Sequence, residues 1–231
     1  MAIELYELAG ADERIRFSPY CWRARLALAH KGLEVRTIPV RFGEKHKIEF
    51  SGQKLVPVLR DSGIVVSDSW NIALYLDEAY PERPRLMDGA QAAALCKFVQ
   101  SWVQMRLSGP VLRTVLVDIH DVCSQEDRIY FRKSREERLG KPLEEAVMPE
   151  AEGRAALKAE LAPMRELLGT QAFLSGAAPA YADYIVFGAF MWARGVSAKN
   201  LLDEDDPVYA WRERMLDLFD GLARKAPAIG A

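Results

Sequence analysis

The first eighty residues combine two kinds of hydrophobic pattern. Apolar and polar positions alternate, or form short apolar runs between turn residues, in four segments that we predict to be strands: residues 3–8, 35–40, 55–59 and 64–66. Apolar positions recur every three or four residues in two other segments, which we predict to be helices: residues 18–32 and 67–80. The predicted order is β-α-β, a less regular segment, and then β-β-α.

The helix predicted at residues 18–32 carries a complete set of boundary signals. Ser18 suits the N-cap, Pro19 the first helical position, and Gly32 the position just past the end. Its expected buried face consists of Trp22, Leu26 and Ala29.

From Gly89 onward the strand patterns disappear. Helical periodicity predicts long helices over residues 90–117, 125–139, 154–168, 183–197 and 207–225. Pro81 and Pro84 indicate a linker. We therefore expect an α/β domain over residues 1–82, followed by an all-α domain over residues 89–231.

Composition excludes several classes of partner. Half of the 231 residues are hydrophobic, which is enough for a sizeable core, and the formal net charge of −2 provides no field that attracts nucleic acid or an anionic membrane. No apolar run approaches the ~18 residues that span a bilayer. The three widely spaced cysteines do not suggest a disulfide framework, so we expect a cytoplasmic protein.

Common catalytic motifs are missing from the sequence. We find no glycine-rich phosphate loop, no GxSxG motif and no paired histidines, so we expect no metal site. The mixed-charge run over residues 127–145 is interpreted as a solvated helix face.

Pro57 interrupts an otherwise good strand. A proline there removes a ladder hydrogen bond and suits an edge, a bulge or a cis bond. A cis Val56–Pro57 bond would turn the Val56 backbone groups outward, where an extended peptide could pair with them.

Asp68 and Ser69 stand at the predicted start of the second helix. Ser67 or Asp68 suits the N-cap, which is a sufficient structural reason for the pair. A helix N-terminus also attracts anions, so Ser69 could hold a carboxylate while Asp68 pairs with an ammonium group.

Taken in order, these motifs resemble the glutathione transferase family, and within it the bacterial lignin β-etherases and the etherase-like fungal transferases. The resemblance rests on Ser18-Pro19-Tyr20, Val56-Pro57-Val58, Asp68-Ser69-Trp70, Tyr80-Pro81, Ala182-Asp183-Tyr184 and Asp205-Asp206-Pro207. It implies a thioredoxin-like N-terminal domain and an all-α C-terminal domain that form a homodimer. One departure is Ala180, where the family usually has a serine or threonine that caps the helix with Asp183.

The resemblance implies glutathione as co-substrate along the N-terminal half, next to Gln53, Lys54, Val56, Pro57, Asp68 and Ser69. The Val56 backbone would pair with the cysteinyl part, beside a cis Pro57. Asp68 and Ser69 would hold the γ-glutamyl end, and Gln53 and Lys54 would lie near the glycine carboxylate.

Ser18 matches the family position that activates the glutathione sulfur. A free thiol has a pKa near 8.5, so its thiolate needs a hydrogen bond and the positive end of a helix dipole. Ser18 would donate that hydrogen bond without becoming a nucleophile. A plain N-cap is the structural alternative, and both roles are compatible.

Two other residues compete with Ser18. Tyr6 lies in the first predicted strand, where we expect it to be packed. Cys21 occupies only the resolving position of a Cys-Pro-Tyr-Cys redox motif, so we expect a buried, inert thiol. Two alternative functions stay open: glutathione-dependent thiol–disulfide exchange or peroxide reduction, and non-catalytic binding of hydrophobic ligands.

The second substrate would lie between the two halves. Phe17, Trp102 and Arg106 are the candidate contacts by position, with Trp192 as a further residue. Core packing is the alternative role for either tryptophan. The resemblance implies an aromatic electrophile there, with aryl ether cleavage as one reaction.

Overall fold

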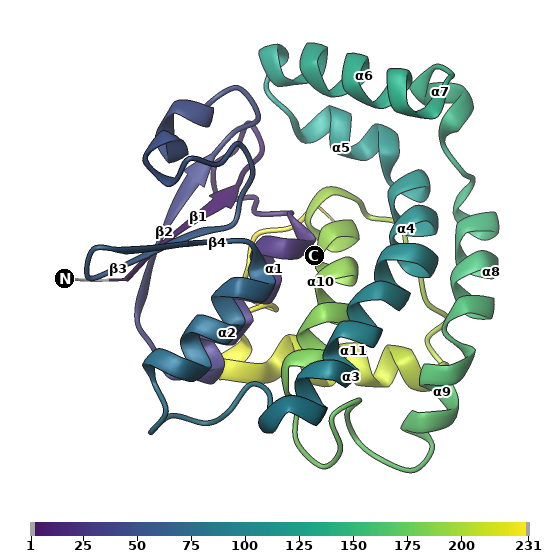
Figure 1. Cartoon of the computed structure of the whole chain (residues 1–231). Helices are drawn as coiled ribbons and strands as arrows, with labels where there is room; N and C mark the ends of the chain where they lie inside the picture. Colours follow the sequence, from purple (N-terminus) through teal and green to yellow (C-terminus); the bar gives the residue numbers. More distant parts are fainter. Residues whose placement is uncertain (1–2, 230–231) are drawn as a thin grey trace.

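The structure is a computed structural model that describes residues 3–229. Its N-terminal part holds a four-stranded mixed sheet formed by β1 (Ile3–Leu8), β2 (Val35–Val40), β3 (Val58–Asp61) and β4 (Ile64–Ser67). The strand order is β2-β1-β3-β4. β1 and β2 run parallel, and the other two pairs are antiparallel (Figure 1). The parallel pair is joined through α1 (Pro19–His30), as a parallel connection requires.

The two faces of the sheet are covered differently. α1 and α2 (Ser69–Ala79) lie together on one face (Figure 1), where Leu5 and Leu59 join the main hydrophobic core. A smaller cluster on the other face includes Tyr6 and Ile48, the latter from the 3₁₀ segment η1 (Lys45–Ser51). This 3₁₀ segment is the less regular stretch expected from the sequence.

The third strand begins later than the sequence pattern predicts. β3 starts at Val58, after a cis Val56–Pro57 bond, whereas the apolar run predicted a strand from Leu55. Leu55 is exposed instead of forming part of the sheet. Pro57 has no N–H to donate to a ladder, so pairing begins beyond it.

The rest of the described chain is helical. Its elements are α3 (Gly89–Trp102), the π-helical η2 (Val103–Leu107), α4 (Ser108–Thr114), α5 (Leu116–Val122), α6 (Gln125–Leu139), α7 (Leu143–Ala146), α8 (Glu150–Glu160), α9 (Ala162–Leu168), α10 (Tyr181–Val196) and α11 (Pro207–Gly221). α10 is almost entirely buried and packs against α1, so it joins the two halves (Figure 1). The predicted fold class, α/β followed by all-α, is confirmed.

Three predicted helices are interrupted. The helix expected over residues 90–117 becomes π-helical over Val103–Leu107, just before Pro110, which cannot donate an N–H, and it ends at Thr114. The Ser108 hydroxyl donates to the Val103 carbonyl at 3.0 Å. The helix expected over residues 154–168 breaks at Leu161. The last helix ends at Gly221 rather than residue 225, after three residues with non-helical dihedral angles.

Asp183 compensates for the missing cap at Ala180. Its buried carboxylate accepts the Ala180 N–H at 3.2 Å, and also the N–H groups of Leu174 (2.8 Å) and Ser175 (3.1 Å). The indole N–H of Trp211 donates to it as well, at 2.9 Å. The carboxylate therefore orders the loop before α10 and anchors α11, without a hydroxyl at Ala180.

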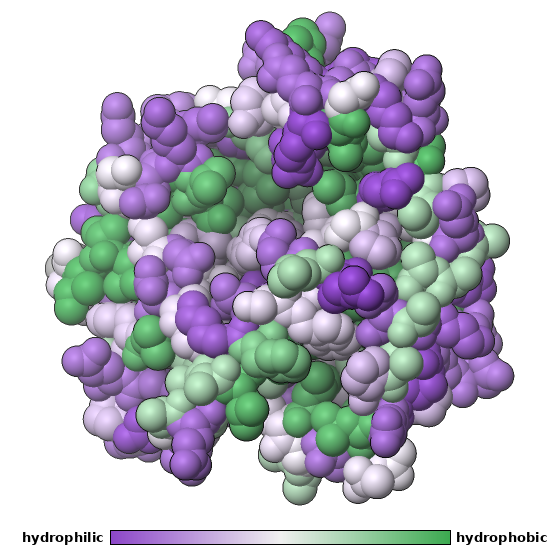
Figure 2. Space-filling model, turned by 45° about the vertical axis from the view of Figure 1, so that its right-hand side comes forward, coloured by the Kyte–Doolittle hydropathy of each residue, from purple (hydrophilic) through white to green (hydrophobic). Residues whose placement is uncertain are grey.

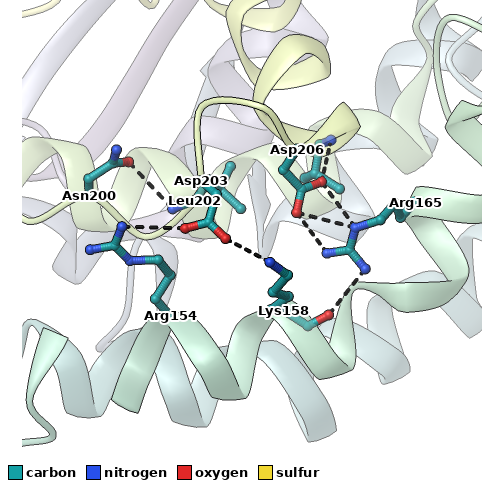
Figure 3. A network of polar contacts seen from close by, with 8 residues as sticks. Arg154, Lys158, Arg165, Asn200, Leu202, Asp203 and Asp206 are labelled. Atoms are coloured by element: carbon teal, nitrogen blue, oxygen red, sulfur yellow. Dashed lines mark hydrogen bonds and ion pairs between the residues drawn. The ribbon is translucent and has the colours of Figure 1, made fainter. Parts of the chain in front are cut away.

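A network of ion pairs fastens α8 and α9 to the segment before α11 (Figure 3). Asp203 accepts hydrogen bonds from Lys158 (2.9 Å) and Arg154 (3.4 Å). Asp206 pairs with Arg165 at 2.7 Å and also caps α11 by accepting the Val208 N–H. This network lies on the far side of the helical half from the sheet.

Among the helices of residues 3–229, we find none with the length and apolar character needed to cross a membrane.

Candidate functional site

A cavity of about 450 Å³ opens between the N-terminal half and the helices, within the size range of small-molecule sites. Most of its lining is apolar, and it includes Leu8, Phe17, Val40, Phe42, Ile48, Leu112, Ile119, Tyr130, Phe131 and Trp192. Figure 2 shows a hollow with hydrophobic side chains in its depth and hydrophilic side chains around it. Such a site favours a ligand with an apolar body.

Ser18 lines this cavity at the N-terminus of α1. Its Oγ accepts the Cys21 N–H at 3.3 Å, as an N-cap does, and its side chain is buried. A hydroxyl has one proton to donate besides its acceptor sites. No carbonyl or carboxylate among residues 3–229 accepts the Ser18 proton, so the hydroxyl can donate to a group in the cavity.

The Val56–Pro57 segment borders the same cavity. Val56 and Lys54 line it, whereas Gln53 is exposed and is not part of the lining. The Asp68 N–H donates to the Pro57 carbonyl at 3.2 Å. That hydrogen bond brings the start of α2 next to the cis peptide.

Asp68 is the N-cap of α2, with a positive φ of 74°. Its Oδ1 accepts the N–H groups of Trp70 (2.9 Å) and Asn71 (3.3 Å), which leaves Oδ2 without a partner among the described residues. The adjacent Ser69 is buried, and its carbonyl accepts the Tyr181 hydroxyl at 2.6 Å. Neither Asp68 nor Ser69 lines the cavity, so they form a separate polar site beyond Val56 and Pro57.

One side of the cavity comes from α6, which sequence reasoning interpreted as a solvated face. That interpretation is wrong for one stripe of the helix: Asp127 and Phe131 are buried, and Arg135 is half-buried. Asp127 accepts the N–H groups of Phe42 (3.2 Å) and Gly43 (2.8 Å), which fixes α6 to the loop after β2. The i, i+4 spacing of Asp127, Phe131 and Arg135 was the signal that could have revealed an inward face.

Within residues 3–229, no group of three or more histidine, cysteine or acidic side chains is arranged to hold a metal ion.

Two family models match the chain over most of its length. Residues 17–79 match the glutathione S-transferase N-terminal domain, and residues 94–217 match the glutathione S-transferase C-terminal domain. The chain belongs to the glutathione S-transferase family.

Related proteins agree with this assignment. Glutathione S-transferase Z1 of Arabidopsis thaliana is 37% identical over 88 residues, which cover 33% of this chain and 39% of that protein. The chain thus matches about two fifths of the length of such curated relatives.

Solved structures match nearly the whole chain. Glutathione transferase GSTFuA3 from Phanerochaete chrysosporium has a TM-score of 0.77 and 26% identity, over 96% of this chain and 92% of that chain. The glutathione S-transferase CsGST63524 of Ceriporiopsis subvermispora was solved in complex with glutathione. It has a TM-score of 0.80 and 25% identity, over 95% of this chain and 97% of that chain.

The residues predicted to contact a second substrate are not all brought together. Phe17 lines the cavity, as does Trp192. Trp102 is half-buried on α3, and Arg106 is exposed and pairs with Glu160 at 2.7 Å. Neither Trp102 nor Arg106 belongs to the cavity lining, so their role as substrate contacts stays a prediction.

Both competitors of Ser18 are buried. The Tyr6 ring packs 5.2 Å from that of Phe50, and its hydroxyl donates to Glu4 at 3.2 Å. Cys21 is fully buried, and burial raises the pKa of its thiol to about 12. Neither side chain lines the cavity. Tyr6 and Cys21 are therefore packing residues, as expected from the sequence.

Proposed function

We propose that this protein is a glutathione-dependent transferase in which Ser18 stabilises the thiolate of bound glutathione. The observation that carries the proposal is the buried Ser18 hydroxyl at the N-terminus of α1, with its proton directed to no backbone or carboxylate acceptor and an apolar cavity beside it. The family membership and the glutathione bound to the Ceriporiopsis subvermispora relative support the choice of co-substrate.

Two effects favour a thiolate at Ser18. A hydroxyl hydrogen bond and the positive end of the α1 dipole both stabilise the charged form of a sulfur that docks there. Lowering the thiol pKa by about two units corresponds to about 2.7 kcal/mol. The Cys21 N–H already uses one acceptor site of Ser18 and holds its oxygen in place.

Glutathione would extend from Ser18 along Val56 toward α2. The Val56 backbone would pair with its cysteinyl part, and Lys54 would face its glycine carboxylate. At the γ-glutamyl end, the free Oδ2 of Asp68 would accept from the ammonium group, and the N-terminus of α2 at Ser69 would attract the carboxylate. The hydrogen bond from Asp68 to Pro57 supports this continuous path.

The reaction would be a displacement at carbon. Glutathione first loses its thiol proton to solvent. The thiolate then forms a carbon–sulfur bond to the electrophile, and the leaving group departs with the electron pair of the broken bond. The apolar cavity supports an aromatic electrophile, because aromatic rings from Phe17, Phe42 and Phe131 line it.

Aryl ether cleavage would be one form of this reaction, with an aryloxide as leaving group. Phenols are weak acids of moderate pKa, near 10 for tyrosine, so an aryloxide leaves more readily than an alkoxide. Incubating the protein with glutathione and a β-aryl ether tests this substrate. Phenol release supports it, whereas conjugation of a haloarene without any phenol release contradicts it.

Thiol–disulfide exchange at Cys21 is disfavoured by its full burial and by its pKa of about 12, since the thiolate is the reactive form. The free, buried Cys21, Cys96 and Cys123 support the proposed cytoplasmic location, where thiols stay reduced.

The decisive experiment titrates the thiolate absorbance of bound glutathione in Ser18→Ala. We expect the pKa of bound glutathione to rise by about one to two units, with a parallel loss of kcat at neutral pH, because the hydrogen-bond donor is gone. Ser108→Ala is the matched control. Ser108 also lines the cavity, but its hydroxyl donates to the Val103 carbonyl. An unchanged titration in Ser18→Ala would reduce Ser18 to a helix cap.

A homodimer completes the proposal. Three exposed apolar side chains follow one face of α3 and η2 at helical spacing: Leu95, Phe98 and Met105. Their exposed fractions are 68%, 72% and 79%, and the half-buried Trp102 lies between them in the spacing. A continuous apolar stripe of this kind marks an interaction surface, and we propose a second copy of this chain as its occupant.

A further inference from the structure

The charged side chains around the cavity are all cationic. Five of them line it: Arg41, Lys45, Lys54, Arg135 and Arg138. No aspartate or glutamate of residues 3–229 is part of the lining. An apolar cavity bordered only by positive charge favours a ligand that combines an apolar body with a negative group.

These cations differ in how far they are already engaged. Arg41 pairs with Glu44 at 2.8 Å, and the Lys45 ammonium lies 4.9 Å from the centre of the Tyr130 ring. Arg135 has no carboxylate partner among the described residues. Its Nη1 donates only to the Ser134 hydroxyl at 2.9 Å, and its buried Nε has no partner at all.

Arg135 is held in an apolar setting. Its guanidinium carbon lies 4.7 Å from the centre of the Phe131 ring and 6.0 Å from that of Phe42. Burial lowers the pKa of Arg135, yet an arginine side chain stays charged in proteins. A half-buried charge without a counter-ion is costly unless an anion joins it.

The backbone around Arg135 is also fixed. Asp127, two helical turns earlier on α6, accepts the N–H groups of Phe42 and Gly43. α6 therefore cannot turn Arg135 away from the cavity without breaking these hydrogen bonds. The guanidinium is a preorganised donor fork for a planar anion.

We propose that Arg135 determines the specificity of this enzyme for the electrophile by binding a carboxylate on an aromatic substrate. The proposal rests on the proposed transferase function. The ring lies on the apolar wall next to Phe131, its carboxylate pairs with the Arg135 guanidinium, and its electrophilic carbon faces the glutathione sulfur at Ser18. Ser18 and Arg135 line the same cavity. In the proposed binding mode, the two carboxylates of glutathione would lie elsewhere, at Lys54 and Ser69 of the N-terminal half.

The test compares two haloarenes that differ in charge: 4-chloro-3-nitrobenzoate and 4-chloro-3-nitrobenzamide, each conjugated with glutathione. The quantity measured is the ratio of kcat/KM for the benzoate to kcat/KM for the benzamide. In Arg135→Met we expect this ratio to fall about 10- to 100-fold, the range of a charge-assisted hydrogen-bonded pair. Arg135→Lys keeps the charge but loses the fork, so we expect an intermediate ratio.

Lys133→Met is the matched control, because Lys133 is an exposed cation of the same helix outside the cavity lining. We expect the wild-type ratio there. Since both substrates are measured on one preparation, partial unfolding of a variant cancels in the ratio.

Three results would overturn the inference. One is an unchanged ratio in Arg135→Met, and another is an equal fall in Lys133→Met. The third is a higher KM for glutathione in Arg135→Met with either electrophile, which would make Arg135 a contact of glutathione itself. Failure of the wild type to conjugate either haloarene would instead refute the proposed transferase function.

Discussion

At the scale of single residues, one oxygen of Ser18 serves both folding and the proposed chemistry. It accepts the Cys21 N–H as a cap and retains a proton for a ligand. The Asp68 carboxylate also has two roles: Oδ1 accepts N–H groups of the first turn of α2, and Oδ2 has no partner among the described residues. The two caps predicted from the sequence, Ser18 and Asp68, are thus also residues that can form a further hydrogen bond with a ligand.

Asp68→Asn separates these two tasks. Asparagine caps helices about as well as aspartate, so we expect little change in the free energy of unfolding. Glutathione should bind about tenfold more weakly, because the ammonium group loses a charged acceptor. Isothermal titration calorimetry measures this affinity.

Asp88→Asn is the control for charge, because Asp88 precedes α3 without a side-chain cap hydrogen bond and should leave glutathione affinity unchanged. Equal affinity of Asp68→Asn and wild type would contradict the role of Asp68.

At the scale of elements, α6 and α10 differ in what their sequences reveal. α10 is buried along almost its whole length, and its periodicity predicts a helix over residues 183–197, close to its observed bounds. α6 is highly charged, so its inward stripe of Asp127, Phe131 and Arg135 is hidden among solvent-exposed residues. Only one residue per turn faces inward, so the hydrophobic periodicity of the α6 sequence is weak. In addition, Asp127 and Arg135 are covered by contacts with Phe42, which is distant in the sequence.

Asp183→Asn tests how much of the α10 start depends on one carboxylate. Four N–H groups now donate to the Asp183 carboxylate. The NH₂ group of an asparagine would replace one of the two accepting oxygens and would face an N–H donor. We expect a loss of about 2–4 kcal/mol in the free energy of unfolding. Urea denaturation monitored by circular dichroism measures the loss.

Glu152→Gln serves as the control, since Glu152 is exposed on α8 and should change stability little. A loss in Asp183→Asn no larger than in this control would mean that the loop before α10 is held by other contacts.

At the scale of the whole molecule, the cavity exists only because two halves meet. Ser18 and Val56 come from the N-terminal half, whereas Phe131 and Arg135 come from α6, far along the chain in the helical half. The buried helix α10 packs on α1 and connects them (Figure 1). In the proposed homodimer, the two copies would meet through the exposed apolar stripe of α3 and η2.

Phe98→Glu tests the proposed dimer. A carboxylate in the middle of the apolar stripe would have to be desolvated on association, so we expect a monomer at micromolar concentration where the wild type is a dimer. Sedimentation velocity measures the mass.

Ile129→Glu is the matched control. Ile129 is equally exposed, at 71%, but lies on α6, so this variant should stay dimeric. A monomeric wild type, or a dimeric Phe98→Glu, would contradict the proposed interface.

Features that depend on neighbours along the chain can be read from local sequence patterns. The strands at residues 3–8 and 35–40, the cap at Ser18 and the start of α2 at Asp68 all follow from short patterns of polarity, turn residues and caps. Hydrophobic periodicity was also sufficient to separate an α/β half from an all-α half.

Features that depend on distant partners become visible only in the folded chain. The fold starts the pairing of β3 only after Pro57, ends α4 at Thr114, supplies Asp183 with three further donors, and places Arg135 in the lining of the cavity. Hydrogen bonds and burial join residues that are far apart along the chain, and a local pattern carries no record of which of them meet.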